Sequence, residues 1–412
     1  MDVRLLVALV VGCASAACAD GSLTFPPNPP VARTGGIDSG PPPEGRLPEP
    51  PPDGEWIEVA PGGDTTCSLG APFRFFVRGG RSDRVLIDFE GGGACWNQTT
   101  CALASRLFSA EIRPMREYAA DIESGKIGGI FDPQPGRTFA SWTLVHIPYC
   151  TGDIHWGNTD HEYAEDLTIK HRGFVNASAA LDWVYAHYLA PANVFVTGCS
   201  GGAYGAALHS AYIAQHYTRS RIAVLADAGA GITTESFLND SLPNWNAQGS
   251  LPSFVPGLDR PLAELSVPDL YSTIGKAFPQ HRFAQTATQY DDNQIFYYTA
   301  MGGQAQDWPA QFRASLSQIE SSTPNFRSYI QPGSMHCALP YPFFFSREVA
   351  GERLADWTES LALGEETPAS VACEGAECCD DPVCDACEGR SEGNCKYCKN
   401  WPASWSECAP HD

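Results

Sequence analysis

The sequence has few positive charges and no long apolar run. Lysine and arginine together number 26 against 48 aspartates and glutamates, which gives a formal net charge of −22. Such a chain cannot neutralise many phosphates, which excludes a general nucleic-acid-binding protein and argues against broad attraction to an anionic membrane or polymer. No apolar run reaches the roughly 18 residues of a membrane-spanning helix, so we expect none. Charged residues make up only 18%, which excludes a charge-rich disordered chain.

Cysteine, by contrast, is abundant. The 412 residues include 16 cysteines, which favours an oxidising compartment, since cytosolic proteins rarely carry so many without bound metal. Apolar residues make up 43% and aromatic residues 11% of the chain, enough for a sizeable core. The length suits two or three domains, or one large α/β domain with small appendages.

The first 55 residues predict an export signal followed by a tether. Residues 1–18 combine a short basic start with an apolar stretch, which is typical of a signal peptide. Within them, Val10–Cys13 resembles a bacterial lipobox, in which the cysteine is lipidated; ordinary secretion is the alternative, because only one basic residue precedes it. Residues 19–55 are rich in proline and predict an extended linker.

Residues 56–365 alternate short apolar runs with helical patterns. This alternation predicts an α/β-hydrolase-like fold, in which helices cover both faces of a mainly parallel sheet. Two helices are expected at 173–188 and 203–217, where apolar residues recur at helical spacing. Strands are expected at 73–77, 85–89, 142–147, 194–197, 222–226, 282–286 and 326–330.

Residues 366–412 form a segment that is dense in cysteine. Eight of the 16 cysteines lie there, including the pairs Cys384–Cys387 and Cys395–Cys398. In a cytosolic protein such C-x-x-C pairs would indicate zinc. With an export signal, a small disulfide-stabilised module is the favoured interpretation and a metal site the alternative.

A serine motif follows the strand expected at 194–197. Gly198-Cys199-Ser200-Gly201-Gly202 matches the G-x-S-x-G nucleophile elbow, and a helix follows it, as that motif requires. The glycines allow a turn too tight for side chains, and the helix dipole favours an anionic intermediate. We therefore expect Ser200 to be a nucleophile, with Cys199 as a minor alternative, and the N–H of Gly201 to donate to an oxyanion.

A triple-glycine segment, Gly91-Gly92-Gly93, follows the strand expected at 85–89. Backbone without side chains can turn its amides toward a substrate oxygen. Gly92 and Gly93 are therefore expected to complete an oxyanion hole with Gly201. A glycine-rich strand end without a catalytic role is the alternative.

The serine also needs a histidine base and an acid that orients it. Among ten histidines, His336 is placed best, in a loop after the last expected strand. Asp291 follows the strand that begins at residue 282 and is the favoured acid, with Asp292 and Asp227 as alternatives. The cysteines of this domain are expected in disulfides of unknown pairing: Cys67, Cys95, Cys101, Cys150, Cys199 and Cys337.

Six segments, taken in order, resemble the pectin acetylesterase family, which includes the Notum carboxylesterases. They are Cys67–Phe73, Glu90–Cys95, Pro148–Asp153, Gly198–Gly202, Tyr290–Gln294 and His336-Cys337. The similarity covers residues 56–363. The sequence departs from the family pattern at Ala94 and Asn293, where the family has aromatic residues, and it lacks the alanine of the family's elbow.

The resemblance implies an exported serine carboxylesterase that removes O-acyl groups, acetyl in preference to longer chains, from a carbohydrate. It implies Ser200 as nucleophile, Asp291 as acid and His336 as base, with an acyl-enzyme intermediate and no metal or organic cofactor. Four further residues near these motifs are expected to contact the substrate: Trp96, Tyr149, Asp153 and Asp227.

Other functions remain open on the sequence alone. A lipase, lipid deacylase or peptidase would share the fold, and a non-catalytic surface protein would act through the cysteine-rich tail.

The expected partner is an acylated carbohydrate, with no nucleic acid and with membrane contact only through an N-terminal lipid. The expected location is outside the cytoplasm, as a secreted protein or one that is lipid-anchored at the cell surface or in the periplasm.

Overall fold

A computed structural model describes residues 47–104 and 106–380. The predicted signal peptide and lipobox, most of the linker, and the pairs Cys384–Cys387 and Cys395–Cys398 lie outside these residues. Among the described helices, none combines the length and apolar composition that crossing a bilayer would require.

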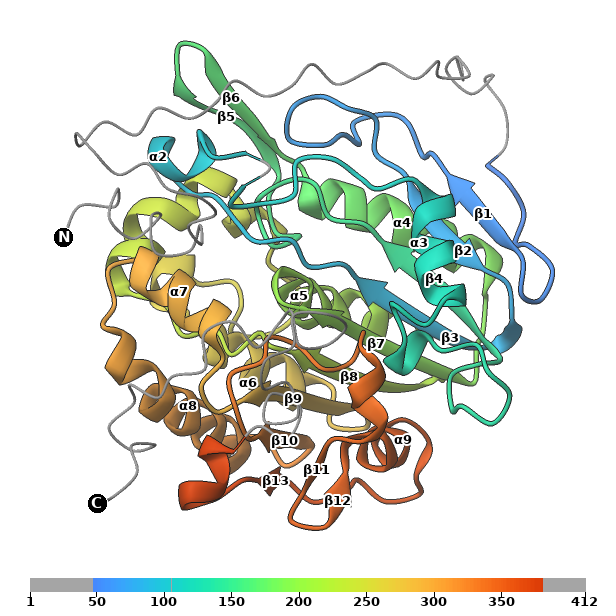
Figure 1. Cartoon of the computed structure of the whole chain (residues 1–412). Helices are drawn as coiled ribbons and strands as arrows, with labels where there is room; N and C mark the ends of the chain where they lie inside the picture. The colour runs from blue at the N-terminus through green and yellow to red at the C-terminus, as the bar shows by residue number, and fades with distance from the viewer. Residues whose placement is uncertain (1–46, 105, 381–412) are drawn as a thin grey trace, which may run out of the picture. The chain divides into compact units, whose positions relative to one another are not determined.

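A nine-stranded sheet forms the centre of the described chain (Figure 1). Its strand order is β1-β2-β4-β3-β7-β8-β9-β10-β13. The pairs β1–β2 and β2–β4 are antiparallel, and every other neighbouring pair is parallel, which confirms the predicted mainly parallel sheet. The strands are β1 (Trp56–Val59), β2 (Phe75–Arg78), β3 (Arg81–Phe89), β4 (Trp142–Ile147), β7 (Asn193–Cys199), β8 (Arg221–Asp227), β9 (Arg282–Thr288), β10 (Phe326–Gln331) and β13 (Val371–Ala372).

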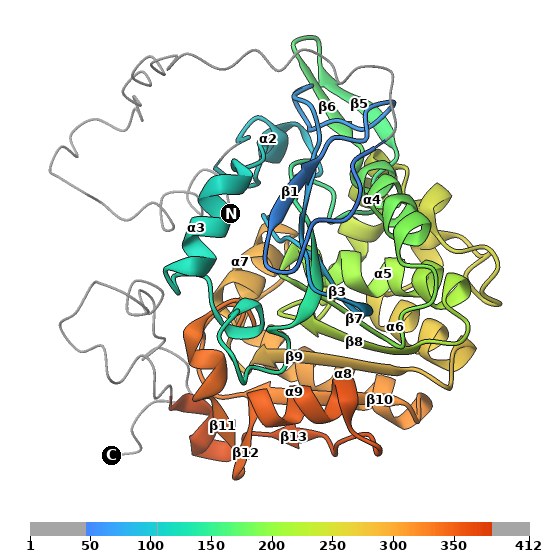
Figure 2. The ribbon, with the colours of Figure 1, turned by 90° about the vertical axis from the view of Figure 1, so that its right-hand side faces the viewer.

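Helices cover both faces of this sheet, as predicted. The two expected helices are α4 (Gly173–His187) and α5 (Gly201–His216), and α5 packs against β7 and β8. Helix α9 (Leu354–Leu363) packs on the same two strands from the other side (Figure 2). Because both faces are covered, β4 is buried at all six positions, and its sequence is a nearly continuous apolar run.

The remaining elements connect and flank the sheet. The hairpins are β5 (Thr159–Ala164) with β6 (Leu167–His171), and β11 (Glu348–Val349) with β12 (Glu352–Arg353). The other α-helices are α2 (Gln98–Cys101), α3 (Met115–Glu123), α6 (Val267–Ala277), α7 (Asp292–Ala300) and α8 (Trp308–Ser322). Between β8 and α6 the chain forms short irregular turns, from η2 (Phe237–Ser241) to η5 (Leu262–Glu264).

The start of the cysteine-rich tail belongs to the main sheet. Residues 371–372, which the sequence assigned to a separate module, form β13 and pair in parallel with β10. A disulfide joins Cys373 to Cys378 directly after this strand. The structure thus places these residues at the sheet edge, where they occupy backbone groups of β10 that would otherwise be unpaired.

Candidate active site

The segments that the sequence analysis singled out meet at one edge of the sheet. The triple glycine follows β3, Ser200 follows β7, Asp291 follows β9 and His336 follows β10. These are the carboxyl ends of parallel strands, where open α/β sheets bind their ligands. Segments far apart in the sequence therefore form one site.

Ser200 lies on a tight turn between β7 and α5. Its backbone has φ 59° and ψ −125°, a strained conformation for a residue with a side chain. The N–H of Ser200 donates to the carbonyl of Asp227 at 2.8 Å, which helps to hold the turn. A Cβ on Gly202 would come within 1.8 Å of the Phe89 carbonyl, so only glycine fits beside β3. This geometry agrees with a nucleophile elbow.

His336 is held by Asp291 through one ring nitrogen. Its Nδ1 lies 2.9 and 3.0 Å from the two carboxylate oxygens of Asp291. Asp291 is fully buried and also accepts the backbone N–H of Gln294 at 2.9 Å and its side-chain amide at 3.0 Å. The other ring nitrogen of His336, Nε2, is buried without a hydrogen-bond partner among the described residues. That is the nitrogen through which a triad histidine exchanges protons with serine.

The surrounding carboxylates tune the proton affinity of this histidine. Burial alone would lower the pKa of His336, but the charge of Asp291, the hydrogen bond to it and the charges of Asp292 and Asp227 together raise the pKa above its usual 6.5. Burial, together with the nearby charge of Asp291, raises the pKa of Asp292 to about 6. Burial likewise raises the pKa of Asp227 to about 6.

Asp227 supports two loops of the site and forms no hydrogen bond with the imidazole among the described residues. Its Oδ2 accepts the backbone N–H groups of Ala338 and Leu339 at 2.7 and 2.8 Å. Because its own carbonyl accepts the N–H of Ser200, one residue holds both the serine turn and the loop after His336. Asp227 is fully buried and lines neither cavity at Ser200, so its position does not suit the predicted substrate contact.

A disulfide ties the serine turn to the histidine loop. It joins Cys199, directly before Ser200, to Cys337, directly after His336, across 138 residues. With its sulfur in this bond, Cys199 is not available as the alternative nucleophile. Two more disulfides, Cys67–Cys150 and Cys95–Cys101, brace neighbouring loops.

The triple glycine lies against the serine turn. A Cβ on Gly91 would lie 2.9 Å from the Cβ of Ser200, and a Cβ on Gly201 would lie 3.8 Å from the Gly92 nitrogen. Gly93 has φ +78°, a conformation that favours glycine. The triple glycine and Gly201 thus lie close together at the serine turn.

Three other predicted substrate contacts prove to be buried supports. Trp96, Tyr149 and Asp153 are at most 2% exposed and line neither cavity. Trp96 packs edge-on against Phe237, and the Tyr149 hydroxyl accepts the N–H of Ile154 at 2.8 Å. The sequence identified them only by their nearness to motifs, and burial becomes visible only in the fold.

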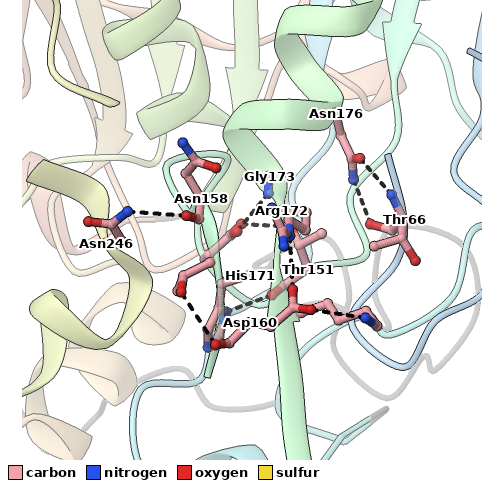
Figure 3. Close-up of polar contacts among 12 residues, drawn as sticks. Thr66, Thr151, Asn158, Asp160, His171, Arg172, Gly173, Asn176 and Asn246 are labelled. Carbon is pink, nitrogen blue, oxygen red and sulfur yellow. Dashed lines mark hydrogen bonds and ion pairs between the residues drawn. The ribbon is translucent and has the colours of Figure 1, made fainter. Parts of the chain in front are cut away.

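Asp153 is the centre of a buried polar cluster. It accepts the Thr151 hydroxyl at 2.6 Å and the N–H of Gly173 at 2.7 Å, yet burial raises its pKa to about 6. Figure 3 shows Thr151 and Gly173 close to His171, whose Nδ1 lies 2.9 Å from the Thr151 carbonyl. This cluster fixes the loop between β4 and the β5–β6 hairpin.

Two cavities meet at Ser200. One has about 720 Å³ of free space, its opening to solvent included, and is largely apolar, with Trp156, Phe237, Leu242 and Trp245 in its wall. The other, with about 1160 Å³ measured in the same way, is more polar and contains Asp88, Glu90 and His146. The residues common to both are Gly93, Ser200, Asn293, Tyr297 and His336.

Part of this lining was not singled out from the sequence. Tyr297 of α7 lines both cavities and donates its hydroxyl to the Leu107 carbonyl at 2.6 Å. Part of the apolar wall comes from residues 232–245, a segment of short irregular turns. Such a segment has no periodicity that would mark its buried side chains.

Two groups of side chains have the spacing of metal ligands. They are Cys95, Cys101 and His171, and Cys199, His336 and Cys337. In each group the two cysteines are bonded to one another, which leaves one histidine as the remaining donor. Neither group therefore offers a metal-binding donor set within the described residues.

Comparison with known proteins agrees with this architecture. The family model described as Pectinacetylesterase matches residues 56–244. The chain is 28% identical over 109 residues to the inactive palmitoleoyl-protein carboxylesterase notum1b of Danio rerio, a match that covers 25% of this chain and 73% of that protein. It is 30% identical over 144 residues to pectin acetylesterase 11 of Arabidopsis thaliana, which covers 34% of this chain but only 35% of that protein.

A solved structure shows the same fold. The Wnt deacylase Notum from Drosophila superposes with a TM-score of 0.57 at 15% identity, covering 78% of this chain and 96% of the other. At that identity the likeness concerns the fold alone. Residues 56–244 are thus similar to the Pectinacetylesterase family, and the described fold is similar to that of Notum.

Proposed function

We propose that this protein is a serine carboxylesterase that hydrolyses an O-acyl ester through Ser200, His336 and Asp291. The observation that carries the proposal is the set of contacts that His336 makes. Asp291 holds its Nδ1, while its buried Nε2 is unpartnered and the side chain lines both cavities at Ser200. The relatives named as a pectin acetylesterase and a Wnt deacylase support hydrolysis of an acyl ester.

The mechanism follows from these positions. His336 accepts the hydroxyl proton as the oxygen of Ser200 attacks the ester carbonyl, and Asp291 stabilises the imidazolium. The amides of Gly92, Gly93 and Gly201 hold the oxyanion. His336 then protonates the departing alcohol, which leaves an acyl-serine, and water activated by the same histidine releases the acid.

We propose a carbohydrate as the alcohol part of the ester, with acetyl as the acyl group. The name of the Arabidopsis relative supports both. The disulfides support a location outside the cytoplasm. Lipidation at Cys13 remains a proposal from the sequence.

A longer acyl group is the second candidate, and the apolar cavity favours it. The wall of this cavity is largely apolar, which suits a hydrocarbon chain. Burial of each further methylene contributes about 0.8 kcal/mol, so an acyl chain of several carbons would bind more tightly there. Two relatives have names that refer to acyl-protein substrates, palmitoleoyl-protein carboxylesterase and Wnt deacylase.

A chain-length series tests both candidates. The full exported chain and Ser200→Ala would be assayed on 4-nitrophenyl esters from acetate to palmitate. We expect activity in the parent and a loss of at least about a thousandfold in the variant. A maximum at acetate supports the acetylesterase, and a maximum at eight carbons or more supports the deacylase.

Two results would contradict the proposal. One is equal activity in the parent and Ser200→Ala. The other is a folded, disulfide-intact parent with no activity on any ester, which would point to a non-catalytic protein. That second outcome has a precedent, since one relative is named as inactive.

A further inference from the structure

The polar cavity contains a second buried histidine–carboxylate pair. Nδ1 of His146 lies 2.7 Å from Oδ2 of Asp88, and the two side chains are 3% and 7% exposed. On the other side of the ring, Nε2 of His146 lies 3.9 Å from Oε2 of Glu90. These three residues line the cavity beside Ser200, and the proposed esterase mechanism does not use them.

Glu90 is fixed at one oxygen and open at the other. Its Oε2 accepts the backbone N–H of Tyr149 at 3.0 Å, while its Oε1 has no hydrogen bond to the described residues. The side chain is 30% exposed, and it belongs to the cavity wall directly before the triple glycine. The backbone contact and the His146–Asp88 pair therefore position an acceptor that faces the substrate space.

Tyr118 provides a second group without a partner. Its hydroxyl is buried and forms no hydrogen bond within the described chain, although the residue is only 4% exposed. Its ring stacks on His146 with centroids 4.0 Å apart, and it lines the same cavity. A buried hydroxyl without a partner costs free energy unless a ligand or water satisfies it.

The charges around Glu90 set what can bind there. Asp88 of β3 and His146 of β4 lie beside Glu90, and the positive charge of Arg113 attracts its carboxylate from farther away. Arg106 also lines the cavity but is exposed to solvent, which screens its charge. The carboxylates of Glu90 and Asp88 would repel a ligand that carries its own carboxylate. The hydroxyl groups of a neutral ligand, by contrast, can donate to Glu90 and accept from Tyr118.

We propose that the polar cavity binds the alcohol half of the ester and selects an uncharged polyhydroxyl group, such as a neutral sugar, over a uronate. Glu90 and Tyr118 are its specificity-determining residues, and His146 with Asp88 positions them. The inference rests on the proposed esterase function, because Ser200 and His336 stand where this cavity meets the apolar one.

The first test compares three esters that share the acyl group preferred in the chain-length series. They are esters of a xylo-oligosaccharide, of an oligogalacturonate and of 4-nitrophenol, which has no free hydroxyls. For the parent we expect kcat/KM at least tenfold higher on the neutral sugar ester than on the uronate ester. Glu90→Gln, which keeps the shape but removes the charge, should reduce this ratio about tenfold.

Tyr118→Phe removes only a hydroxyl that has no partner in the protein, so no protein contact is lost. We expect kcat/KM on the neutral sugar ester to fall about fivefold more than on the 4-nitrophenyl ester. Tyr185→Phe is the matched control, because the Tyr185 hydroxyl is also buried without a partner but stacks on His216, outside the cavity. It should leave both ratios unchanged.

A binding measurement separates this inference from the esterase proposal. Titration calorimetry on Ser200→Ala would use the unesterified xylo-oligosaccharide and oligogalacturonate, with and without Tyr118→Phe. Preferential binding of the neutral sugar, weakened by Tyr118→Phe, supports the inference even if the parent hydrolyses nothing. Three results would overturn the inference. They are no binding of either sugar, equal binding of both sugars, and kinetic ratios that neither Glu90→Gln nor Tyr118→Phe changes.

Discussion

Asp291 and Asp292 are neighbours in the sequence but occupy different positions at the site. Asp291 is fully buried with both oxygens at Nδ1 of His336, whereas the backbone N–H of Asp292 donates to the Ser334 carbonyl at 3.2 Å. Of the two, only Asp291 forms a side-chain hydrogen bond with the imidazole among the described residues. The sequence favoured Asp291 but kept Asp292 as an alternative. Neighbouring side chains point in different directions, and a sequence does not show which of the two points toward the histidine.

Asp291→Asn should lower kcat by about three to four orders of magnitude, because the amide cannot stabilise the imidazolium or keep its tautomer. It should also move the acid limb of the pH profile. His336 acts as a base only when neutral, and its raised pKa places the loss of activity above pH 6.5 as the pH falls. Without the Asp291 charge, that limb should shift to lower pH. The measurement is kcat/KM from pH 5 to 9.

Asp292→Asn is the control for this prediction. It removes a nearby carboxyl that does not contact the ring, so kcat should fall less than tenfold. A loss as large as that of Asp291→Asn would instead identify Asp292 as the acid.

At the residue scale, the sequence indicates which residues belong to the serine and histidine motifs. It does not indicate the hydrogen bonds that support these motifs in the fold. Ser200 and His336 follow from a local pattern and from chain order. The bond from Asp227 to the N–H of Leu339 joins residues that are 112 positions apart, and no local pattern encodes it. For the same reason Asp227 and Asp153 were expected to contact the substrate, although both are fully buried.

At the scale of elements, the Cys199–Cys337 disulfide joins the ends of β7 and the loop after β10. Replacing both cysteines with alanine should destabilise the fold by about 5 kcal/mol in the chain-entropy model of a long loop. Because misplacement of a catalytic group by about 1 Å can cost a hundredfold in rate, kcat of the folded variant should fall at least tenfold. Urea unfolding and active-site titration measure the two effects separately.

The Cys67–Cys150 pair offers a matched control. It closes a loop of similar length, 83 residues, and lines neither cavity. Its removal should destabilise the fold by a similar amount but reduce kcat much less. If both double variants lost kcat equally, the disulfide at the site would contribute stability alone.

The longer strands of the main sheet were predictable, because several parallel strands buried on both faces, such as β7 and β8, contain apolar runs. All seven expected strands overlap strands of the sheet. The turns between β8 and α6 could not be predicted, since their form depends on packing over the apolar cavity rather than on a local period. The size of that cavity was therefore hidden from the sequence.

At the scale of the molecule, several buried histidines should make the fold sensitive to acid. Burial lowers the pKa of His155 and of His171 to about 3, and of His209 to about 4. The unfolded chain, with histidine pKa values near 6.5, then binds more protons. Stability is fully present above pH 6.5 and is lost as the pH falls toward these values.

His209→Gln tests this expectation. His209 alone should contribute a loss of about 3 kcal/mol between pH 6.5 and 4, since one pKa unit corresponds to about 1.4 kcal/mol. Glutamine does not titrate and can still donate to the His155 carbonyl, which lies 3.1 Å from Nε2. The free energy of unfolding should therefore vary less with pH in the variant, as urea titrations would show; identical slopes would contradict the prediction.

Domain boundaries were only partly predictable at this scale. The amino-acid composition distinguishes the proline-rich residues 19–55 and the cysteine-rich residues 366–412 from the central residues 56–365. It could not show that residues 371–372 complete the sheet, because a two-residue strand has no pattern of its own. That contact depends on an open edge of β10, which exists only after the rest of the sheet has formed.

The junction of the two cavities has a kinetic consequence. On the proposed arrangement, the alcohol can leave through the polar cavity while the acyl chain still fills the apolar one. Whatever enters the vacated space next decides the fate of the acyl-serine. Water gives hydrolysis, but a hydroxyl compound that fits there competes with water and receives the acyl group. An added sugar should then be acylated, and the hydrolase would act in part as a transferase.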